Sequence, residues 1–197
     1  MNVYDISQEV FGCAVYPGDP APVRQVMRSM ERGDGYNLTA FQMCAHNGTH
    51  VDAPFHFLKD GNTVDQIGME RFVGMAYVAE HTGPVQAEDA RNMLAQAAAC
   101  HREAAKRILI KGKAEVTEQA ARVFADSGVY LLGNESQSVG PEQAPAAVHR
   151  ILLKADVVLL EGIRLGVVSA GVYLLSAAPL NLGRADGAPC RAVLVQL

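Results

Sequence analysis

The segment AHNGTHVDAPFHF, residues 45–57, gathers three of the chain's six histidines and one aspartate. Imidazole nitrogens and carboxylate oxygens together form a ligand set suited to Zn²⁺, Fe²⁺ or Mn²⁺. A polar surface loop is the competing interpretation, but three histidines and an aspartate around a turn sequence favour a metal site. Its four candidate residues are His46, His50, Asp52 and His56.

Ligands of a single ion must lie within a few ångströms of one another, so the backbone between His46 and His50 has to bend. In an extended strand, at about 3.3 Å per residue, the two backbones would lie about 13 Å apart. Asn47-Gly48-Thr49 is a typical turn sequence, and Gly48 can adopt the left-handed conformation that reverses the chain. We therefore expect a turn that brings the two imidazoles together.

Beyond this turn, residues 51–57 are expected to be extended. His50, Asp52 and His56 then project from one face, and the opposite face carries only Val51, Ala53, Phe55 and Phe57. We expect the apolar face to pack on the core. The polar face needs a shared partner, because buried imidazoles and carboxylates without one are costly. A divalent cation would satisfy all of these groups.

Two residues from the second half of the chain extend the candidate site. Glu161 ends a strand expected at Asp156–Glu161, and a glutamate in the core is rarely left unpaired. His149 lies toward the end of a helix expected at Glu142–Leu153, twelve residues before Glu161. A helix-to-strand turn would direct both side chains at the same pocket. The remaining histidines, His81 and His101, lack such neighbours, and we expect both at the surface.

These candidates need a scaffold, and the chain predicts alternating strands and helices. Strands are expected at Tyr4–Ser7, Tyr36–Ala45, Arg71–Ala79, Arg107–Ile110, Val129–Gly133, Asp156–Glu161, Gly171–Ala178 and Arg191–Gln196. Helices are expected at Gln86–Ala105, Thr117–Ser127 and Glu142–Leu153. The alternation indicates a layered α/β fold. The first half is richer in strands than a doubly wound fold, so we expect mixed β-sheets with helices packed on one side.

Composition limits the partners and the compartment. With 197 residues and 49% hydrophobic residues, residues 1–197 are expected to form a single domain. The net charge of −4 and the lack of a basic run disfavour nucleic acid and anionic membranes as partners. We see no secretory signal and no apolar run near the roughly 20 residues of a membrane helix. The four scattered cysteines favour reduced thiols in the cytoplasm.

Sequence motifs of other enzyme classes are missing. There is no Gly-x-Gly-x-x-Gly and no P-loop, so a nucleotide cofactor is not indicated. There is also no Gly-x-Ser-x-Gly, the motif of a serine hydrolase elbow. A small-molecule substrate at a metal site is the remaining expectation.

The segment from His46 to His56 resembles the signature of the metal-dependent cyclase and arylformamidase family, which includes bacterial kynurenine formamidases. His-x-Gly-Thr-His-x-Asp-x-Pro-x-His is matched without a gap. Tyr4-Asp-Ile-Ser7 and Tyr16-Pro-Gly-Asp19 are similar to the family's N-terminal motifs. Residues 187–194 are similar to its last strand, so the resemblance covers almost the whole chain.

This resemblance implies a swivelling β/β/α (cyclase-like) fold, a homodimer and two divalent metal ions, usually zinc, with manganese as a second option. It implies that His46, His50 and Asp52 hold one ion. His149 and Glu161 would hold the second, with Asp52 as a bridge. In the same family, His56 would transfer a proton instead of binding metal.

The implied activity is hydrolysis of a C–N amide bond, that of N-formyl-L-kynurenine in tryptophan catabolism. One departure leaves the substrate open: Glu135 stands where many relatives carry Asp, within residues 133–138, and Ser138 keeps the family's Ser. The alternatives are a hydrolase of a cyclic amide, imide or lactone, and an inactive metal-dependent binder of small molecules. Candidates to meet a substrate carboxylate are Arg24, Arg28 and Arg191.

Overall fold

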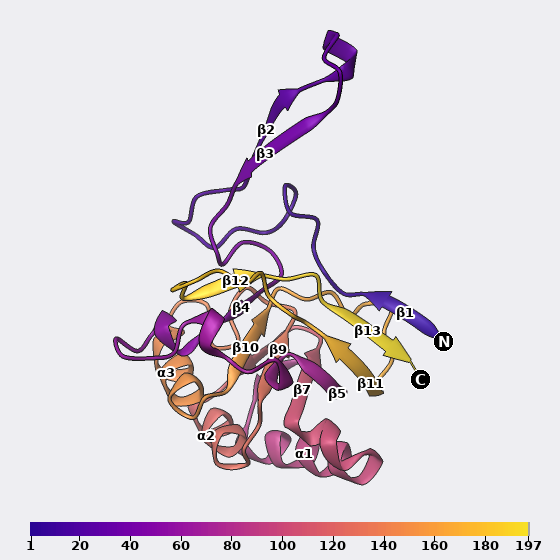
Figure 1. Ribbon diagram of the computed structural model, residues 1–197. Coiled ribbons are helices and arrows are strands. Elements are labelled where there is room, and N and C mark those ends of the chain that lie inside the picture. The colour runs from indigo at the N-terminus through magenta and orange to yellow at the C-terminus, as the bar shows by residue number, and fades with distance from the viewer. Residues whose placement is uncertain (197) are drawn as a thin grey trace.

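The computed structural model describes residues 1–196, and its main element is one nine-stranded sheet (Figure 1). In spatial order, its strands are β1 (Asn2–Asp5), β13 (Val193–Gln196), β11 (Gly171–Ser176), β5 (Val73–Glu80), β7 (Arg107–Lys111), β9 (Leu131–Asn134), β10 (Val158–Glu161), β4 (His50–Asp52) and β12 (Gly187–Pro189). Two small sheets pair β2 (Val23–Arg28) with β3 (Leu38–Gln42), and β6 (Gly83–Val85) with β8 (Ala114–Val116). The α-helices are α1 (Ala87–Cys100), α2 (Glu118–Asp126) and α3 (Ala146–Lys154).

The centre of the large sheet is parallel and both of its sides are antiparallel. Strands β5, β7, β9 and β10 run parallel to one another. On one side β11, β13 and β1 pair antiparallel, and on the other side β4 and β12 do. Parallel neighbours need crossover connections, and α1, α2 and α3 lie in the three connections between the parallel strands. The predicted mixed sheet is confirmed.

All three α-helices cover the same face of the sheet (Figure 1). Each has buried residues at helical spacing, which gives it one apolar face: Ala90, Met93 and Ala97 in α1, Ala120, Ala121 and Phe124 in α2, and Val148, Leu152 and Leu153 in α3. Ile108 and Ile110 of β7 meet this layer. Within residues 1–196, none of these helices has both the length and the apolar character to cross a membrane.

The opposite face of the parallel centre is covered by the antiparallel strands at the two sides of the same sheet. Leu109, Leu131 and Leu160 from the parallel centre join a second core with Val51 of β4 and Leu194 of β13. Neighbouring residues of a strand point to opposite faces, which explains why Leu109 lies in this core while Ile108 lies under the helices. The sheet is therefore curled, and β4 lies directly beside β10.

Two predicted helices are shorter than expected. The helix predicted at Gln86–Ala105 ends at Cys100, because His101 is extended with a φ of −162°, and a separate 3₁₀ helix follows over Arg102–Lys106. The helix predicted at Glu142–Leu153 begins only at Ala146, with Pro145 as its N-cap. Proline has no N–H to donate within a helix, so helices commonly begin there.

The segment after the histidine turn differs from the expected strand. The strand covers only His50–Asp52, and after the extended Ala53, Pro54–His56 forms a 3₁₀ helix with proline at its first turn. Ala53 is buried and Phe57 packs against the core, but Phe55 is 41% exposed, so the prediction that residues 51–57 bury one apolar face is wrong at Phe55. Proline's fixed φ suits the start of a helical turn, and that turn moves His56 out of line with the strand.

Candidate metal centre

The turn between the first two histidines has the bend that the sequence predicts. Gly48 adopts a left-handed φ of +66°, which favours glycine. Thr49 Oγ1 donates a hydrogen bond of 2.8 Å to the carbonyl of Gly162, which directly follows β10. A side chain at Gly162 would overlap the Gly48 carbonyl. The turn is thus fastened to the end of β10, and the rings of His46 and His50 lie 5.1 Å apart.

The pairing of β4 with β10 brings the two halves of the candidate site together. In this antiparallel register Glu161 faces His50 and Leu159 faces Asp52. His50 Nε2 lies 3.6 Å from Glu161 Oε2. From helix α3, His149 Nε2 reaches to 3.2 Å from Glu161 Oε1. The convergence of His149 and Glu161 with the histidine segment is therefore a feature of the fold.

Asp52 lies at the centre of the cluster, and its two oxygens face different histidines. Oδ1 lies 2.8 Å from His46 Nδ1 and 3.4 Å from His50 Nε2. Oδ2 lies 3.5 Å from His149 Nε2, beyond the distance of a well-formed hydrogen bond. This oxygen is buried and has no hydrogen-bond partner within residues 1–196, so it is free to accept a cation.

Backbone groups also contact the side chains of His50, His149 and Glu161. His50 Nδ1 lies 3.0 Å from the Gly48 carbonyl, and His149 Nδ1 lies 2.9 Å from the Pro145 carbonyl. Each Nδ1–H can donate to its carbonyl, which leaves Nε2 as the lone-pair nitrogen directed at the cluster. Glu161 Oε1 accepts a hydrogen bond of 2.7 Å from Val139 N. Such outer contacts are typical of metal ligands, because they fix the tautomer and the orientation.

The cluster is buried, and its imidazoles and carboxylates lie in contact with one another. Side-chain exposure is 1% for Asp52, 2% for His50, and 3% for both His149 and Glu161, against 13% for His46. Burial on its own disfavours a charged imidazole. Hydrogen bonds with Asp186 and Asp52 nevertheless raise the pKa of His46 to about 11. For His149, the neighbouring carboxylates of Asp52 and Glu161 likewise outweigh burial and raise the pKa to about 10.

The donor atoms fit a divalent cation. In two overlapping groups the ligand atoms all lie within 4.8 Å of one another: His46, His50 and Asp52 in one, and Asp52, His149 and Glu161 in the other. Ligands about 2.0–2.2 Å from one ion have comparable separations. Imidazole with carboxylate suits several divalent metals. A cation would also offset the charge of the two buried carboxylates, which is expensive when unpaired.

His56 lies at the mouth of this cluster. Its side chain is 28% exposed. The His56 ring lies 4.1 Å from the ring of His46 and 6.2 Å from that of His149, measured between centroids. It makes no ion-pair contact with Asp52 or Glu161 within the described residues; its carboxylate neighbour is Asp186, with His56 Nδ1 3.3 Å from Asp186 Oδ2. This position differs from that of the four buried side chains.

Sequence reasoning missed Asp186. Its Oδ2 also lies 2.8 Å from His46 Nε2, so the carboxylate contacts two of the predicted site residues. The hydrogen bonds to His46 and then His56 hold the pKa of Asp186 well below its ordinary value. Asp186 lies in an ordinary loop sequence, Arg184-Ala-Asp-Gly187. The available signal was its place just before the segment 187–194, which is similar to the family's last strand.

None of the three arginine candidates for a substrate carboxylate forms an ion pair with the cluster within the described residues. The guanidinium of Arg191 is 2.6 Å from Asp5, and that of Arg28 is 3.3 Å from Asp34. Arg24 belongs to the exposed strand β2.

The carboxylate of Glu135, the residue that departs from the family pattern, accepts hydrogen bonds from backbone amides. Its Oε2 accepts a hydrogen bond of 2.7 Å from Gly112 N, and its Oε1 accepts one of 2.8 Å from Leu165 N. Ser138 is 2% exposed, and its carbonyl accepts a hydrogen bond from Asn134 Nδ2. The extra methylene of Glu135 therefore lets the carboxylate tie together the segments that follow β7 and β10.

Comparison with known proteins now identifies the family. A model of a family described as putative cyclase matches residues 4–141. The chain belongs to the cyclase family. This cyclase-family chain is 33% identical over 209 residues to a kynurenine formamidase from Bacillus cereus, with 96% of the chain and 95% of the relative covered. The resemblance based on the histidine motif is confirmed.

Solved structures share the fold of this cyclase-family chain. One, described as a potential metal-dependent hydrolase with cyclase activity, has a TM-score of 0.81 and 27% identity, and the match covers 98% of this chain and 96% of that chain. Isatin hydrolase A from Labrenzia aggregata also has a TM-score of 0.81, at 20% identity, and the match covers 100% of this chain and 94% of that chain. At 20% identity, the match to isatin hydrolase A shows a shared fold and nothing about activity.

Proposed function

We propose that the protein is a metal-dependent hydrolase that converts N-formyl-L-kynurenine to L-kynurenine and formate, a step of tryptophan catabolism. The observation that carries this proposal is the pair of ligand groups that share Asp52, with His56 beside them at the mouth of the site. The kynurenine formamidase from Bacillus cereus supports the substrate, because it matches 96% of the chain.

The proposed metal content is two zinc ions per subunit, with manganese as the second choice. His46, His50 and Asp52 would hold one ion, and His149, Glu161 and Asp52 would hold the other. This assignment is supported by Asp52, whose Oδ1 faces the first pair of histidines while Oδ2 faces His149. Nitrogen and oxygen ligands without thiolates suit both metals.

When bound, the ions supply Lewis acidity, which polarises a carbonyl and lowers the pKa of a water toward about 7. The protein's own contribution to proton transfer is His56. An imidazole can both take up and release a proton, which suits it to general acid and base catalysis. His56 is partly exposed while His149 and Glu161 are buried, which supports a role in contact with an entering substrate.

The overall reaction is a hydrolysis in which water supplies every added atom. The oxygen of water forms a bond to the formyl carbon, and the bond between that carbon and the aryl nitrogen breaks. One proton of the water passes to His56, and His56 gives a proton to the departing nitrogen, so that L-kynurenine leaves as the neutral arylamine. The formyl group leaves as formate, and the second proton of the water returns to the site or to solvent.

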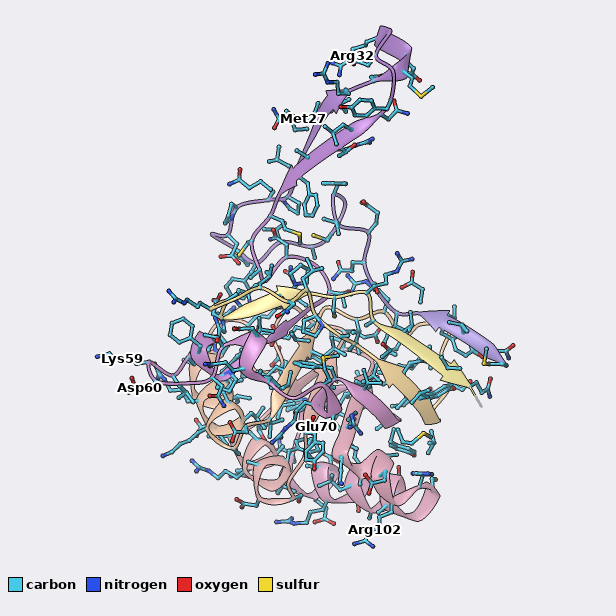
Figure 2. All side chains as sticks on the ribbon, in the orientation of Figure 1. Met27, Arg32, Lys59, Asp60, Glu70 and Arg102 are labelled. Carbon is cyan, nitrogen blue, oxygen red and sulfur yellow. The ribbon has the colours of Figure 1, made fainter. Side chains whose placement is uncertain are left out.

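We also propose that the protein acts as a homodimer assembled through the arm, the hairpin of residues 23–42. The arm projects from the body in Figure 1, and Figure 2 shows Met27 and Arg32 far from the sheet. Its large apolar side chains are 45–61% exposed: Val23, Val26, Met27, Met30, Tyr36, Leu38 and Phe41. A lone hairpin is marginally stable, and exposed apolar patches mark interaction sites.

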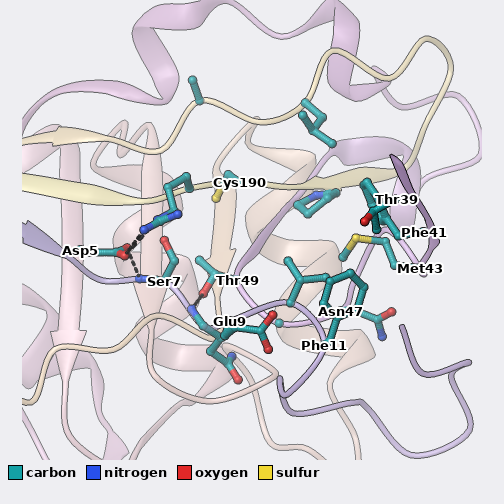
Figure 3. A pocket seen from close by; sticks show the side chains of 17 residues that line it. Asp5, Ser7, Glu9, Phe11, Thr39, Phe41, Met43, Asn47, Thr49 and Cys190 are labelled. Atoms are coloured by element: carbon teal, nitrogen blue, oxygen red, sulfur yellow. Dashed lines mark hydrogen bonds and ion pairs between the residues drawn. The ribbon is translucent and has the colours of Figure 1, made fainter. Parts of the chain in front are cut away.

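A pocket at the base of the arm offers a matching surface. It has a volume of about 940 Å³, and Phe11, Phe41 and Met43 lie on one of its sides (Figure 3). The predicted metal ligands do not line it; Asn47, Gly48 and Thr49 of the histidine turn do. An apolar segment from a second copy would therefore lie next to the turn that positions His46 and His50.

The proposal extends to the compartment and to the domain. Cys13, Cys44, Cys100 and Cys190 are all free, which suits a reducing compartment such as the cytoplasm. Residues 1–197 are taken as one hydrolase domain, because the relative from Bacillus cereus matches 96% of the chain.

The proposed function is tested by metal analysis of the purified protein together with a turnover assay on N-formyl-L-kynurenine. We expect about two zinc ions per subunit and release of L-kynurenine that a chelator abolishes and added zinc restores. Isatin and small lactones serve as the matched substrate panel. Turnover of a cyclic substrate without turnover of N-formyl-L-kynurenine would assign the alternative hydrolase activity. Tight binding with no hydrolysis of any substrate would make the protein a binder.

A further inference from the structure

The carboxylate of Asp186, at the mouth of the site, contacts both His46 and His56. Asp186 Oδ2 lies 2.8 Å from His46 Nε2 and 3.3 Å from His56 Nδ1. The two imidazole rings are stacked at 4.1 Å between centroids, with an angle of 30° between their planes. A single oxygen therefore joins a proposed metal ligand to the proposed proton-transfer residue.

The backbone fixes the place of Asp186. Strand β12 pairs with β4 so that Gly187 faces Asp52, and the Asp186 carbonyl accepts a hydrogen bond of 2.9 Å from Ala53 N. At Gly187, a Cβ atom would lie 2.6 Å from the Val51 carbonyl oxygen and 2.8 Å from His46 Cε1. The absence of a side chain at Gly187 thus lets the strand pass close enough to His46 for the preceding carboxylate to reach both rings.

The segment that carries Asp186 is also tied to the segment that follows His56. Val64 N donates a hydrogen bond of 2.9 Å to the Ala185 carbonyl. Arg184 N donates one of 2.9 Å to Asp65 Oδ1. These contacts on the N-terminal side of Asp186 complement the Ala53 contact, so the carboxylate is held from both sides although it is 41% exposed.

We propose that Asp186 is the positioning residue of His56: it accepts the Nδ1 proton of that imidazole and so keeps Nε2 as the nitrogen that exchanges a proton with the substrate. This inference rests on the proposed function, since it gives His56 a reaction to serve. Which nitrogen of a histidine carries the proton is set by the hydrogen bond that the other nitrogen makes. The same oxygen accepts from His46 Nε2–H, which leaves His46 Nδ1 for the ion beside Asp52.

The contacts also define a rival role. His46, His56 and Asp186 have ligand atoms within 4.8 Å of one another, so Asp186 could itself hold an ion. The two roles differ in what a substitution removes. A positioning carboxylate affects the rate through His56 and leaves the metal count unchanged, whereas a ligand carboxylate takes an ion with it.

The test uses the zinc-loaded full-length protein in wild-type form and as Asp186→Asn, which keeps the shape of the side chain and removes its charge. We expect unchanged zinc content, kcat on N-formyl-L-kynurenine lower by about 10–100-fold, and KM within about twofold. When His56→Ala is already present, Asp186→Asn should lower kcat by no more than about twofold, because residues that act as a unit are not additive.

Asp65→Asn is the matched control, since Asp65 holds the same segment through Arg184 N without contacting a histidine. It should leave kcat within about twofold. An equal loss of kcat in Asp65→Asn would show that Asp186 matters only for loop structure and would overturn the inference. Loss of an ion from Asp186→Asn, or a full additional loss of kcat in the His56→Ala background, would overturn it too.

A spectroscopic measurement keeps this inference separate from the proposed function. ¹H–¹⁵N NMR of histidine-labelled, zinc-loaded protein should show His56 with its proton on Nδ1 in the wild type and a loss of that preference in Asp186→Asn. If N-formyl-L-kynurenine is not hydrolysed, the proposed function fails while the tautomer still tests Asp186. If the wild type carries the proton on Nε2 of His56, the positioning role is wrong whatever the substrate.

Discussion

Asp52 Oδ2 lies 3.5 Å from Nε2 of His149, although the two residues come from opposite halves of the chain. The other oxygen of Asp52 is 2.8 Å from His46 Nδ1. Strand β4 and helix α3 meet here because β4 pairs with β10, the strand that follows α3. One carboxylate therefore links the two ligand groups, and the curled sheet is what brings them together.

Replacing His56 should separate metal binding from turnover. His56→Ala is expected to keep the full metal content, because His56 lies outside the two buried ligand groups. Its kcat should fall by about 10²–10⁴-fold, the usual contribution of a general acid or base. His50→Ala, which removes a buried side chain of the cluster, should lose both metal and turnover. Loss of metal from His56→Ala would show that the two roles are wrongly divided.

Ion binding should release protons at pH 7. In the ion-free protein, hydrogen bonds with Asp186 and Asp52 overcome the effect of burial and raise the pKa of His46 to about 11. Since this pKa lies above 7, the imidazole is protonated and must give up a proton before it coordinates an ion. The zinc affinity should therefore rise as the pH increases from 6 to 8.

Isothermal titration calorimetry of zinc into chelator-treated protein checks the proton release. In two buffers with different ionisation enthalpies, the observed heats should differ by an amount that corresponds to about one proton or more per subunit. Identical heats in both buffers, with an affinity that does not change between pH 6 and pH 8, would contradict this prediction.

Glu135 should stabilise the fold and leave the metal in place. Its carboxylate accepts hydrogen bonds from Gly112 N and Leu165 N, and a lost hydrogen bond that leaves a donor unsatisfied costs about 1–3 kcal/mol. Glu135→Ala should lower Tm by roughly 3–10 °C, at about 2–4 °C per kcal/mol for a chain of this size. Glu142→Ala, at an exposed position nearby, is the control and should change stability by no more than about 0.5 kcal/mol.

The zinc content of the wild type and of both variants is measured together with their thermal denaturation. Glu135→Ala should bind as much zinc as the wild type. A normal Tm for Glu135→Ala would mean that the two backbone contacts contribute nothing. A normal Tm together with an altered substrate preference would indicate that Glu135 shapes the substrate pocket.

The arm should control the oligomeric state. Leu38 is 46% exposed on β3, and Leu38→Asp would place a charge within the proposed interface. A contact of this kind is expected to cost about 2 kcal/mol or more, about thirtyfold in the dimer Kd. Val167, which is 82% exposed on the body, supplies the control Val167→Asp, and this change should leave the dimer intact.

Analytical ultracentrifugation at several protein concentrations measures this difference. The wild type and Val167→Asp should sediment as dimers at concentrations where Leu38→Asp sediments as a monomer. A wild type that remains monomeric at tens of micromolar would contradict the proposed homodimer.

Much of the candidate site was predictable because its chemistry lies in a short segment. The glycine between His46 and His50 indicates the bend, and the structure has Gly48 at a φ of +66°. Glu161 was found because a carboxylate at the end of an apolar strand needs a partner. His149 alone resembles any helical histidine, and only its spacing of twelve residues from Glu161 indicates a shared pocket.

The rest depends on contacts that a sequence does not display. Asp186 reaches His46 only because β12 lies beside β4, a pairing between segments far apart along the chain. The extended conformation expected through His56 is wrong, because the proline-led 3₁₀ turn at Pro54–His56 overrides the alternating pattern. Strand β2 has no buried side at all, so it lacks the alternation that identifies a half-buried strand.

The most direct test of the two-ion centre is anomalous diffraction at the zinc edge from crystals of the zinc-loaded protein. We expect two peaks per subunit, one among His46, His50 and Asp52 and the other among Asp52, His149 and Glu161. Either a single peak that leaves His149 and Glu161 without metal, or no peak at these side chains, would contradict a centre in which Asp52 joins two ions.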